Sequence, residues 1–448
     1  MSMAVSSHIS ANSLDGHQPK AKNMNKKLFS FLSALLLACG LHAADKVTVK
    51  VSNPLAIDRV GETVELSVDR LSKKLDGATQ FVVCDADGRE IPSQQTYDGK
   101  LIFQANVGGK ASSQYTVSAG KPNAYEARVF GRAVPERKDD FAWENDRTCY
   151  RTYGPALQRS GERAFGYDVF NKRTSRLVVN ERFALEFDPT IQSICDKLRA
   201  QGRNDLAQDV YYELMCYHVD HGTGQDCYKV GPTLGCGTDA LLENGGNIVY
   251  PWCYKTVEIL DNGPLRFTFR LTFNPETVDG QEVVETRIIS LDAGSHLNKA
   301  SISFSGLNKA NPITTGIVIH EENPTAFVIN EAAGYMGYED LGDSKQFQEK
   351  YRPFYNKTFG RIYVGAVYPE KMNAIKYQPF TEADKPNRGG ALGHLLGITT
   401  LKPDGSYTYY FGSGWSNNPE TAFQTLSDWE KYLSDYAQKV KKPLVLKY

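Results

Sequence analysis

Residues 46–120 alternate apolar and polar positions in short runs that turn-forming dipeptides separate. The runs are VTVKVSN, ETVELSV, TQFVVCDADG, KLIFQANV and SQYTVSAG, broken by Asp-Gly and Gly-Gly pairs. A period of two residues is typical of strands that bury one face. This pattern predicts a small β-sandwich over residues 45–125.

A stretch rich in proline and charge, GKPNAYEARVFGRAVPERKDD, follows as a linker or crossing segment. Strand-like runs then continue to about residue 415, among them RLVVNERFALEF, KTVEILDNGPLRFTFRLTF, EVVETRIISL, TGIVIH and SYTYYFG. Their spacing favours antiparallel pairing over a parallel α/β sheet. The predicted fold class is therefore mainly β: the small sandwich is followed by a large antiparallel β-sandwich over residues 140–448, with a few helices.

Helical spacing interrupts this pattern in two places. Apolar residues on either side of Gly202 predict one kinked helix or two short helices over residues 194–215. Asn418 and Pro419 have the residue types of a helix cap and a first turn. A second, C-terminal helix is predicted to start there, with one apolar face formed by Phe423, Leu426, Trp429, Leu433 and Tyr436.

Residues 1–44 have the pattern of an export signal that begins at Met24. Lys26 and Lys27 precede the apolar run 28–38, which is too short to span a bilayer. Cleavage after Ala43 or Ala44 would release a periplasmic, outer-membrane-associated or secreted protein without a transmembrane segment. The residues before Cys39 also resemble a lipoprotein box, so a lipid anchor at Cys39 stays an alternative.

The composition restricts the class of partner. A formal net charge of -1 and a pI near 6.7, with both signs interspersed, give no basic surface for nucleic acid. The 25 Tyr, 21 Phe and 4 Trp fit a β-rich fold, and they also fit stacking on sugars by Trp143, Trp252 and Trp415.

Seven cysteines follow Cys39, and their spacing gives no metal motif. No C-x-x-C or H-E-x-x-H pattern occurs, and the acidic residues are too sparse for a calcium loop. No metal and no cofactor is predicted. Cys216 and Cys227 could form a disulfide, although buried free thiols are the simpler interpretation.

The run YHVDHGTGQDCYKVGPTLGCG, residues 217–237, combines titratable groups with five glycines and has no helical or strand period. Glycine lets a backbone turn sharply or approach a ligand, so this loop is a candidate for chemistry. Its candidate residues are His218, Asp220, His221, Asp226 and Tyr228. A turn-rich connection whose polar groups satisfy its own backbone is the alternative. His320 and His394 could reach the site from neighbouring loops, but they are interpreted as structural.

A second dense motif, WENDRTCYRTY, covers residues 143–153. If this segment is extended, Asn145, Arg147, Arg151 and Tyr153 share one face, which suits an anion such as a sugar carboxylate. An ordinary ladder of charged cross-strand pairs is the alternative.

Together, WENDRTCYRTYGPAL and the 217–237 motif resemble the domain-of-unknown-function family numbered 4861, which occurs in secreted proteins of the Bacteroides group. The resemblance covers nearly all of the chain after the leader. It implies a place in polysaccharide-utilisation loci and a fold similar to galactose-mutarotase-like domains. It implies no catalytic residues.

Three functions fit these residues. In a uronate lyase, Arg147 and Arg151 would neutralise the sugar carboxylate while His218 or Tyr228 removes the adjacent proton. In a glycoside hydrolase, Asp146 would act with Asp220 or Asp226. The third possibility is a non-catalytic glycan-binding protein. In each case the substrate is predicted to be an acidic oligosaccharide or polysaccharide, held by Trp143, Asn145, Arg147, Arg151, Tyr153, His221 and Asp226.

Overall fold

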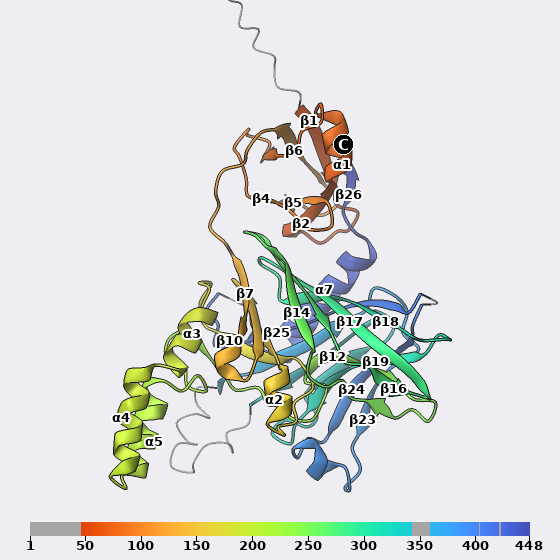
Figure 1. Ribbon diagram of the computed structural model, residues 1–448. Helices are drawn as coiled ribbons and strands as arrows, with labels where there is room; N and C mark the ends of the chain where they lie inside the picture. Colours follow the sequence, from red (N-terminus) through yellow and green to blue (C-terminus); the bar gives the residue numbers. More distant parts are fainter. Residues whose placement is uncertain (1–45, 343–358, 403, 421–422) are drawn as a thin grey trace, which may run out of the picture. The chain divides into compact units, whose positions relative to one another are not determined.

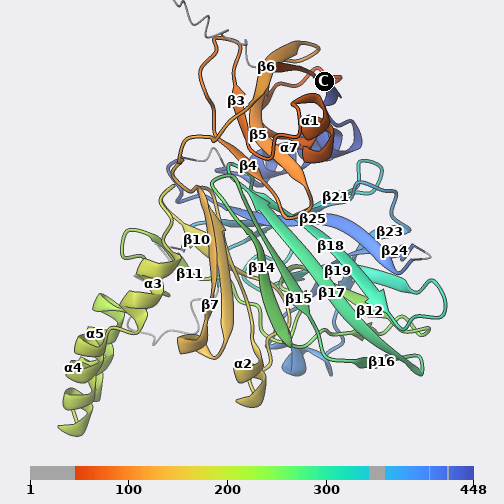
Figure 2. The same cartoon turned by 45° about the horizontal axis from the view of Figure 1, so that its top comes forward.

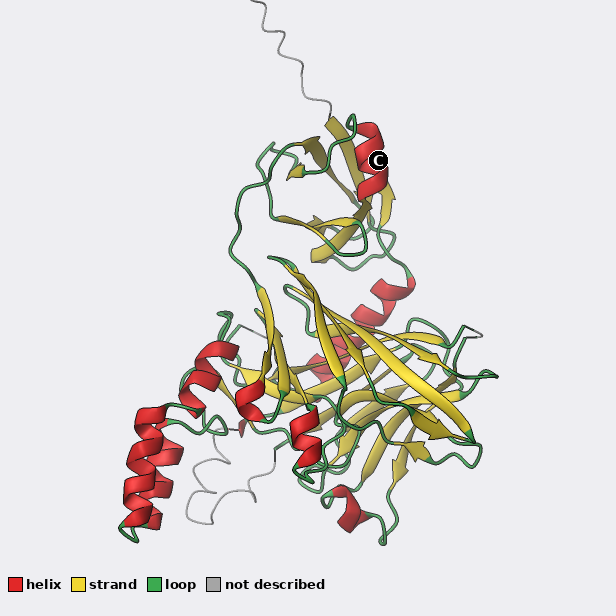
Figure 3. Cartoon of the chain, in the orientation of Figure 1, coloured by secondary structure: helices red, strands yellow, loops and turns green. Residues whose placement is uncertain are grey.

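The computed structural model describes residues 46–342, 359–402, 404–420 and 423–448. The predicted export signal and Cys39 lie outside the described residues. Every ladder between strands in the described ranges is antiparallel, and strands far outnumber helices (Figure 3). The expected mainly β fold with antiparallel sheets is confirmed.

Two sheets of four and three strands form the first part of the fold. The four-stranded sheet has the order β26-β1-β6-β3 and the three-stranded sheet the order β2-β5-β4. Their bounds are β1 (Lys46–Ser52), β2 (Arg59–Ser67), β3 (Phe81–Cys84), β4 (Ser93–Gln95), β5 (Lys100–Val107), β6 (Ser112–Ala119) and β26 (Val445–Lys447), with helix α1 (Val68–Lys74) after β2.

Strand β26 comes from the other end of the chain and pairs with β1, opposite Lys50, Val51 and Ser52. Leu444 and Leu446 pack on the same hydrophobic core as β1, β2, β5 and β6. The sequence pattern did not foresee this, because residues 445–447 were grouped with the large sandwich. The short run is too brief to show a period of its own.

A five-stranded sheet with the order β11-β10-β9-β8-β7 carries both sequence motifs. Its strands are β7 (Val129–Val134), β8 (Asp140–Asn145), β9 (Cys149–Thr152), β10 (Asp168–Lys172) and β11 (Gly224–Asp226). The helical segments η1 (Pro135–Arg137), α2 (Pro155–Arg159) and α3 (Val179–Glu186) connect or follow these strands. The run RLVVNERFALEF, expected as a strand, contains α3, whose Val179 and Phe183 are buried.

A second five-stranded sheet packs face to face with a nine-stranded sheet (Figures 1 and 2). The former has the order β13-β12-β19-β24-β23, with bounds β12 (Cys236–Leu242), β13 (Ile248–Val249), β19 (Pro312–Ile319), β23 (Ala374–Pro379) and β24 (Gly393–Thr400). The helical turn η3 (Lys385–Arg388) links its last two strands.

The nine-stranded sheet has the order β14-β15-β17-β18-β25-β22-β21-β20, and β16 pairs with β17 beside this path. Its strand β17 alternates buried and partly exposed residues along QEVVETRIISLD, as a half-buried strand should. The bounds are β14 (Thr256–Asn262), β15 (Arg266–Thr272), β16 (Glu276–Val278), β17 (Gln281–Asp292), β18 (Leu297–Ser305), β20 (Phe327–Asn330), β21 (Tyr335–Asp340), β22 (Ile362–Val367) and β25 (Ser406–Trp415).

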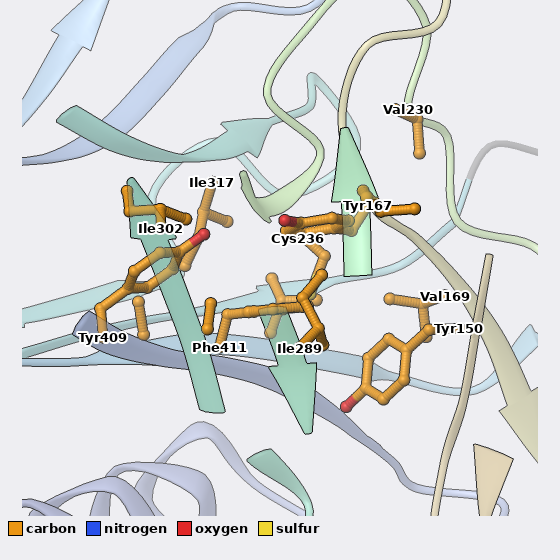
Figure 4. Packing of buried hydrophobic residues seen from close by; sticks show 14 of the residues in the cluster. Tyr150, Tyr167, Val169, Val230, Cys236, Ile289, Ile302, Ile317, Tyr409 and Phe411 are labelled. Atoms are coloured by element: carbon orange, nitrogen blue, oxygen red, sulfur yellow. The ribbon is translucent and has the colours of Figure 1, made fainter. Parts of the chain in front are cut away.

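The core between these sheets is unusually aromatic. The rings of Tyr167 and Phe411 stack at 4.3 Å, and Tyr150 and Tyr409 pack on Phe411 from either side (Figure 4). Aromatic pairs of this kind add to the free energy gained by burying their area. They fix the strands that carry the two motifs.

Three longer helices complete the fold. The 194–215 prediction corresponds to two helices, α4 (Pro189–Ala200) and α5 (Asn204–Leu214), and Gly202 takes a left-handed φ of 73° between them. The C-terminal helix α7 (Leu426–Lys441) exists, but the predicted start is wrong. Thr425 caps it through a capping box with Asp428, the stronger N-terminal signal.

The cysteines form no cross-links. All seven that follow position 45 are free thiols, and all but Cys84 are buried. The possible disulfide between Cys216 and Cys227 is therefore not formed.

Candidate functional site

The segment 143–153 is a β-hairpin, not one extended strand. Strand β8 ends at Asn145 and β9 starts at Cys149. Between them, Oδ1 of Asn145 accepts hydrogen bonds from the backbone N–H groups of Arg147 and Thr148. Because this turn reverses the chain between Arg147 and Arg151, the face that the two arginines were expected to share does not exist.

Trp143 and Asn145 support this hairpin from inside. Trp143 is fully buried and its Nε1 donates to Oδ1 of Asn298 at 2.8 Å, so it offers no surface to a sugar. Asn145 is also fully buried and donates to the carbonyl oxygens of Asp292 and Ser295. Neither side chain is placed to hold a substrate.

Asp146 and Arg147 are engaged at the turn itself. Asp146 forms an ion pair with Arg128 and accepts the backbone N–H of Gly294 at 2.6 Å. Arg147 is partly exposed and faces Glu420, with Nη1 and Oε2 3.5 Å apart. The carboxylate proposed for hydrolysis is therefore held in a structural ion pair.

Arg151 lies at the centre of a buried group that we call the Arg151 cluster, formed by Arg151, Asp140, Asp168, Asp226, Tyr153 and Tyr217. The guanidinium Nε lies 3.0 Å from Oδ2 of Asp168, and Nη2 lies 3.0 Å from Oδ2 of Asp226. Tyr153 donates its hydroxyl to the same oxygen of Asp168 at 2.9 Å. The first and second sequence motifs thus meet here, as predicted for Arg151, Tyr153 and Asp226.

This meeting does not leave Arg151 available for a substrate. Its donors point at Asp168, Asp226 and the hydroxyl of Tyr217, and its guanidinium lies 4.5 Å from the ring centre of Phe170. A guanidinium surrounded by carboxylates has no free fork with which to grip a sugar carboxylate. The predicted role of Arg151 as the anion-binding residue is therefore not supported.

Two aspartates of the Arg151 cluster have raised pKa values. Burial raises the pKa of Asp140 to about 7 and the pKa of Asp226 to about 8, although Arg151 acts in the opposite direction on both. Both carboxyl oxygens of Asp140 lack a hydrogen-bond partner, and its Oδ2 is 3.7 Å from Nε of Arg151. These are properties of an acid, but the three aspartates are at most 3% exposed.

The remaining loop residues stabilise the path of the loop. His218 Nδ1 donates to the carbonyl oxygen of Asp226 at 2.8 Å, and burial lowers the pKa of His218. Asp220 accepts two backbone N–H groups of the loop and pairs with Arg173 at 3.1 Å. A ring nitrogen of His221 lies 3.0 Å from the carbonyl oxygen of Cys216.

Beyond Asp226 the same loop reaches a second group of side chains, which we call the His320 site: Tyr228, His320, Tyr338 and Asp340. Nδ1 of His320 lies 3.0 Å from Oδ2 of Asp340, and the hydroxyl of Tyr338 accepts the backbone N–H of His320 at 3.2 Å. His320 follows the end of β19, and Asp340 ends β21 in the opposite sheet. The site therefore lies where the two packed sheets end together.

The pKa values of His320 and Tyr228 are both shifted upward at this site. Burial lowers the pKa of His320, but the neighbouring carboxylate of Asp340 outweighs it, so the net shift is upward. Burial also raises the pKa of Tyr228 well above its usual range, and its ring lies 6.0 Å from that of His320. The Tyr228 hydroxyl is buried without a hydrogen-bond partner. Tyr228 therefore keeps its proton at neutral pH, and Asp340 favours the protonated form of His320.

Charges of both signs act near this pair, since Glu322 raises the pKa of His320 and Lys229 lowers it. Lys229 is exposed and close enough to act on the pKa of His320, while Arg388 and His320 both act on that of His394. The guanidinium of Arg388 stacks on Tyr250 at 3.7 Å.

A model of the family described as "Domain of unknown function (DUF4861)" matches residues 51–446. The chain belongs to this family. The uncharacterized protein P7 of Formosa agariphila is similar to this DUF4861 chain, with 24% identity over 437 residues that cover 93% of this chain and 97% of that protein.

Two solved structures resemble the DUF4861 chain at a low level. An α-mannosidase from Enterococcus faecalis V583 shares 10% identity at a TM-score of 0.41, covering 90% of this chain and 46% of that one. A glycosyl hydrolase family 38 protein from Enterococcus faecalis shares 10% identity at a TM-score of 0.44, covering 91% and 47%. The chain spans about half of their length. With both TM-scores below 0.5, nothing about activity is transferred.

The four residues expected to converge in this DUF4861 protein divide among three places. Arg147 lies at the hairpin turn, Arg151 and His218 at the Arg151 cluster, and Tyr228 at the His320 site. The predicted single site is therefore not formed as expected.

Sequence reasoning noted that His320 ends an apolar strand, but it did not consider Asp340. His320 and His394 were interpreted as structural. For His394, in β24, this holds, since its Nε2 accepts the backbone N–H of Leu234 at 3.1 Å. A signal for His320 did exist: His320 and Asp340 both end apolar runs that could be strands of packed sheets.

Two general features of the DUF4861 protein complete the description. Across the described ranges, no three His, Cys, Asp or Glu side chains are grouped as metal ligands. None of the helices with described residues is long and apolar enough to cross a membrane.

Proposed function

We propose that this protein is a carbohydrate-active lyase that cleaves glycans containing uronic acids at the His320 site. One observation carries the proposal: Asp340 orients His320 from 3.0 Å, while the unpartnered hydroxyl of Tyr228 lies in the same site. A base that a carboxylate orients and a separate proton donor are the two groups that β-elimination needs.

The reaction uses each group once. With Nδ1 of His320 hydrogen-bonded to Asp340, Nε2 takes the proton from the carbon next to the sugar carboxylate. The electron pair forms a carbon–carbon double bond, the glycosidic C–O bond breaks, and Tyr228 gives its proton to the departing oxygen. The reaction consumes no water, and proton exchange with solvent restores His320 and Tyr228.

An acidic sugar requires cations near this site. The proton beside a carboxylate becomes acidic only when the negative charge of the carboxylate is neutralised. Lys229 and Arg388 supply positive charge beside His320 and His394. They take over the role that the sequence pattern assigned to Arg147 and Arg151.

Hydrolysis is the second candidate, and the raised pKa values of Asp140 and Asp226 support it. A hydrolase requires two carboxyl groups on either side of the scissile bond. Because Asp140 and Asp226 both face one arginine instead of lying on either side of a space for the scissile bond, the lyase is the better fit.

A panel of pectic and other uronic oligosaccharides tests the proposal. Absorbance reports new double bonds, and a reducing-end assay reports every cleavage. A lyase increases both signals, whereas a hydrolase increases only the second. If neither signal rises while a glycan still binds, the protein is a binding protein and the proposal is wrong.

We also propose that the protein is exported and belongs to a polysaccharide-utilisation system. The charged, apolar and small-residue pattern of residues 24–45 supports this. Mass spectrometry of the mature N-terminus in the native host tests it. A start after Ala43 or Ala44 indicates simple cleavage, a lipidated Cys39 indicates an anchor, and an uncleaved N-terminus in the cytoplasm contradicts export.

A further inference from the structure

Trp252 stands beside a pocket that opens between the two packed sheets, away from the His320–Asp340 pair. The pocket has a volume of about 50 Å³, enough for a few water molecules. Strands β12 and β13 line one side and β16 to β18 the other. Its lining includes Trp252, Phe273, Asn274, Glu276, Glu285 and Gln158.

The tryptophan at this pocket differs from the other three in the chain. Trp252 is 38% exposed, whereas Trp143, Trp415 and Trp429 are at most 2% exposed. An exposed indole beside an apolar hollow gives a flat surface on which the C–H face of a sugar ring packs. Asn274, exposed, and Gln158, partly buried, add hydrogen-bonding groups at the same pocket.

The charged groups of the pocket are acidic. Glu276 and Glu285 both line it, and the arginine behind Glu285 is already engaged. Arg287 pairs with Glu285 and Asp239, and its guanidinium lies 4.4 Å from the centre of the Phe273 ring. An anionic ligand would meet two carboxyl groups without a free cation, so the pocket favours an uncharged molecule.

A chain of rings connects this pocket with the His320 site. Trp252 contacts Phe165 at 6.0 Å between ring centres, Phe165 contacts Tyr250 at 5.7 Å, and Tyr250 contacts His394 at 6.1 Å. His394 in turn is close enough to His320 to interact with it electrostatically. The pocket therefore lies within a few aromatic side chains of the proposed chemistry.

We propose that the Trp252 pocket is a subsite for a neutral sugar residue, with the C–H face of the ring on the indole and one edge in the apolar hollow. The proposal rests on the carbohydrate function given above, but not on the lyase chemistry. It implies that the glycan carries an uncharged sugar near the uronic acid that is attacked. The Trp252 pocket would then select a neutral sugar, and the His320 site would select a uronic acid.

Acrylamide quenching of tryptophan fluorescence tests this subsite in the whole protein, because Trp252 dominates the accessible emission. The probes are the methyl glycosides of a neutral hexose, a 6-deoxyhexose and a hexuronic acid. We expect the two neutral glycosides to reduce quenching by about half at saturation, and the uronate to leave it unchanged. Equal protection by the uronate, or protection by none of the three, overturns the proposal.

Two variants assign the effect to the pocket. Trp252→Phe should remove the sugar-dependent change in quenching, and Asn274→Ala should weaken the apparent affinity several-fold. Phe187→Ala is the matched control, since Phe187 is also 38% exposed and lies outside the pocket. Turnover of uronic oligosaccharides is measured in parallel. Turnover without sugar protection rejects the subsite alone, and protection without turnover rejects the lyase alone.

Discussion

Oδ2 of Asp340 lies 3.0 Å from Nδ1 of His320 and joins the ends of two strands that belong to opposite sheets. This contact fixes which ring nitrogen of His320 carries the proton and leaves the other to act as a base.

Replacing Asp340 with asparagine should shift the pH profile of turnover. Asp340 is the main group that raises the pKa of His320, and the base works only when it has lost its proton. The acidic limb of kcat/KM should therefore move to lower pH in D340N, with a lower maximum. Asp220→Asn is the control, because Asp220 holds only the loop and Arg173. An unchanged limb in D340N would show that His320 is not the base.

Replacing Tyr228 with phenylalanine should separate activity from stability. The hydroxyl is buried without a partner, so its removal should leave the urea midpoint unchanged or slightly higher. The same change should lower kcat by ~10²-fold to 10⁴-fold if Tyr228 is the proton donor. Unfolding and turnover are measured on the same preparation. A large loss of stability with normal turnover would assign Tyr228 to the core.

His320→Ala should abolish turnover, whereas His218→Ala should preserve it. His218 is held against the backbone of Asp226 and contributes to the loop, not to the proposed chemistry. Steady-state rates on the best uronic oligosaccharide decide between them. If His218→Ala abolished turnover and His320→Ala preserved it, the active site would lie at the Arg151 cluster.

The two arginines of the first motif should differ sharply in their contribution to stability. Arg151→Ala leaves buried carboxylates without their cation and should lower the free energy of unfolding by ~3–5 kcal/mol. Arg147→Ala removes only a partly exposed pair with Glu420 and should change it by less than ~0.5 kcal/mol. Urea titration measures both. Equal effects would contradict the structural assignment of Arg151.

The free energy of unfolding should fall as pH rises, because Asp140 is buried in the folded protein. Its pKa increases from an ordinary 3.8 to about 7 on folding, so the folded state binds more protons across that interval. The resulting stability is fully present below pH ~4 and is lost as pH rises through ~7. Asp140→Asn should flatten this slope between pH 4 and 7, whereas the exposed Asp205→Asn should not. An unchanged slope in D140N would show that Asp140 ionises normally.

The fold was largely predictable because apolar and polar residues alternate along many of its strands. Strand β17 keeps a strict period of two over QEVVETRIISLD, and Gly202 marks the break between α4 and α5. The strand predicted around Val179 is wrong, because an apolar cluster of this length is compatible with both a strand and a short helix.

The site was less predictable, since it depends on contacts that no local pattern encodes. The loop 217–237 was singled out from its composition, and its residues Asp226 and Tyr228 enter buried polar groups. The Asn-Asp pair at 145–146 forms a turn. Arg147 therefore does not share a face with Arg151, as it would in an extended strand. His320 and Asp340 are twenty residues apart and meet only when the two sheets pack.

The pairing of β26 with β1 places a constraint on the order of folding. Until residues 445–447 have been synthesised, the outer edge of β1 presents unpaired backbone groups to any other extended chain. Joining strands separated by nearly the whole sequence also requires a large loop to close, which slows this step. The N-terminal sheet therefore starts from a strand that is synthesised early and is completed only by a strand that is synthesised late.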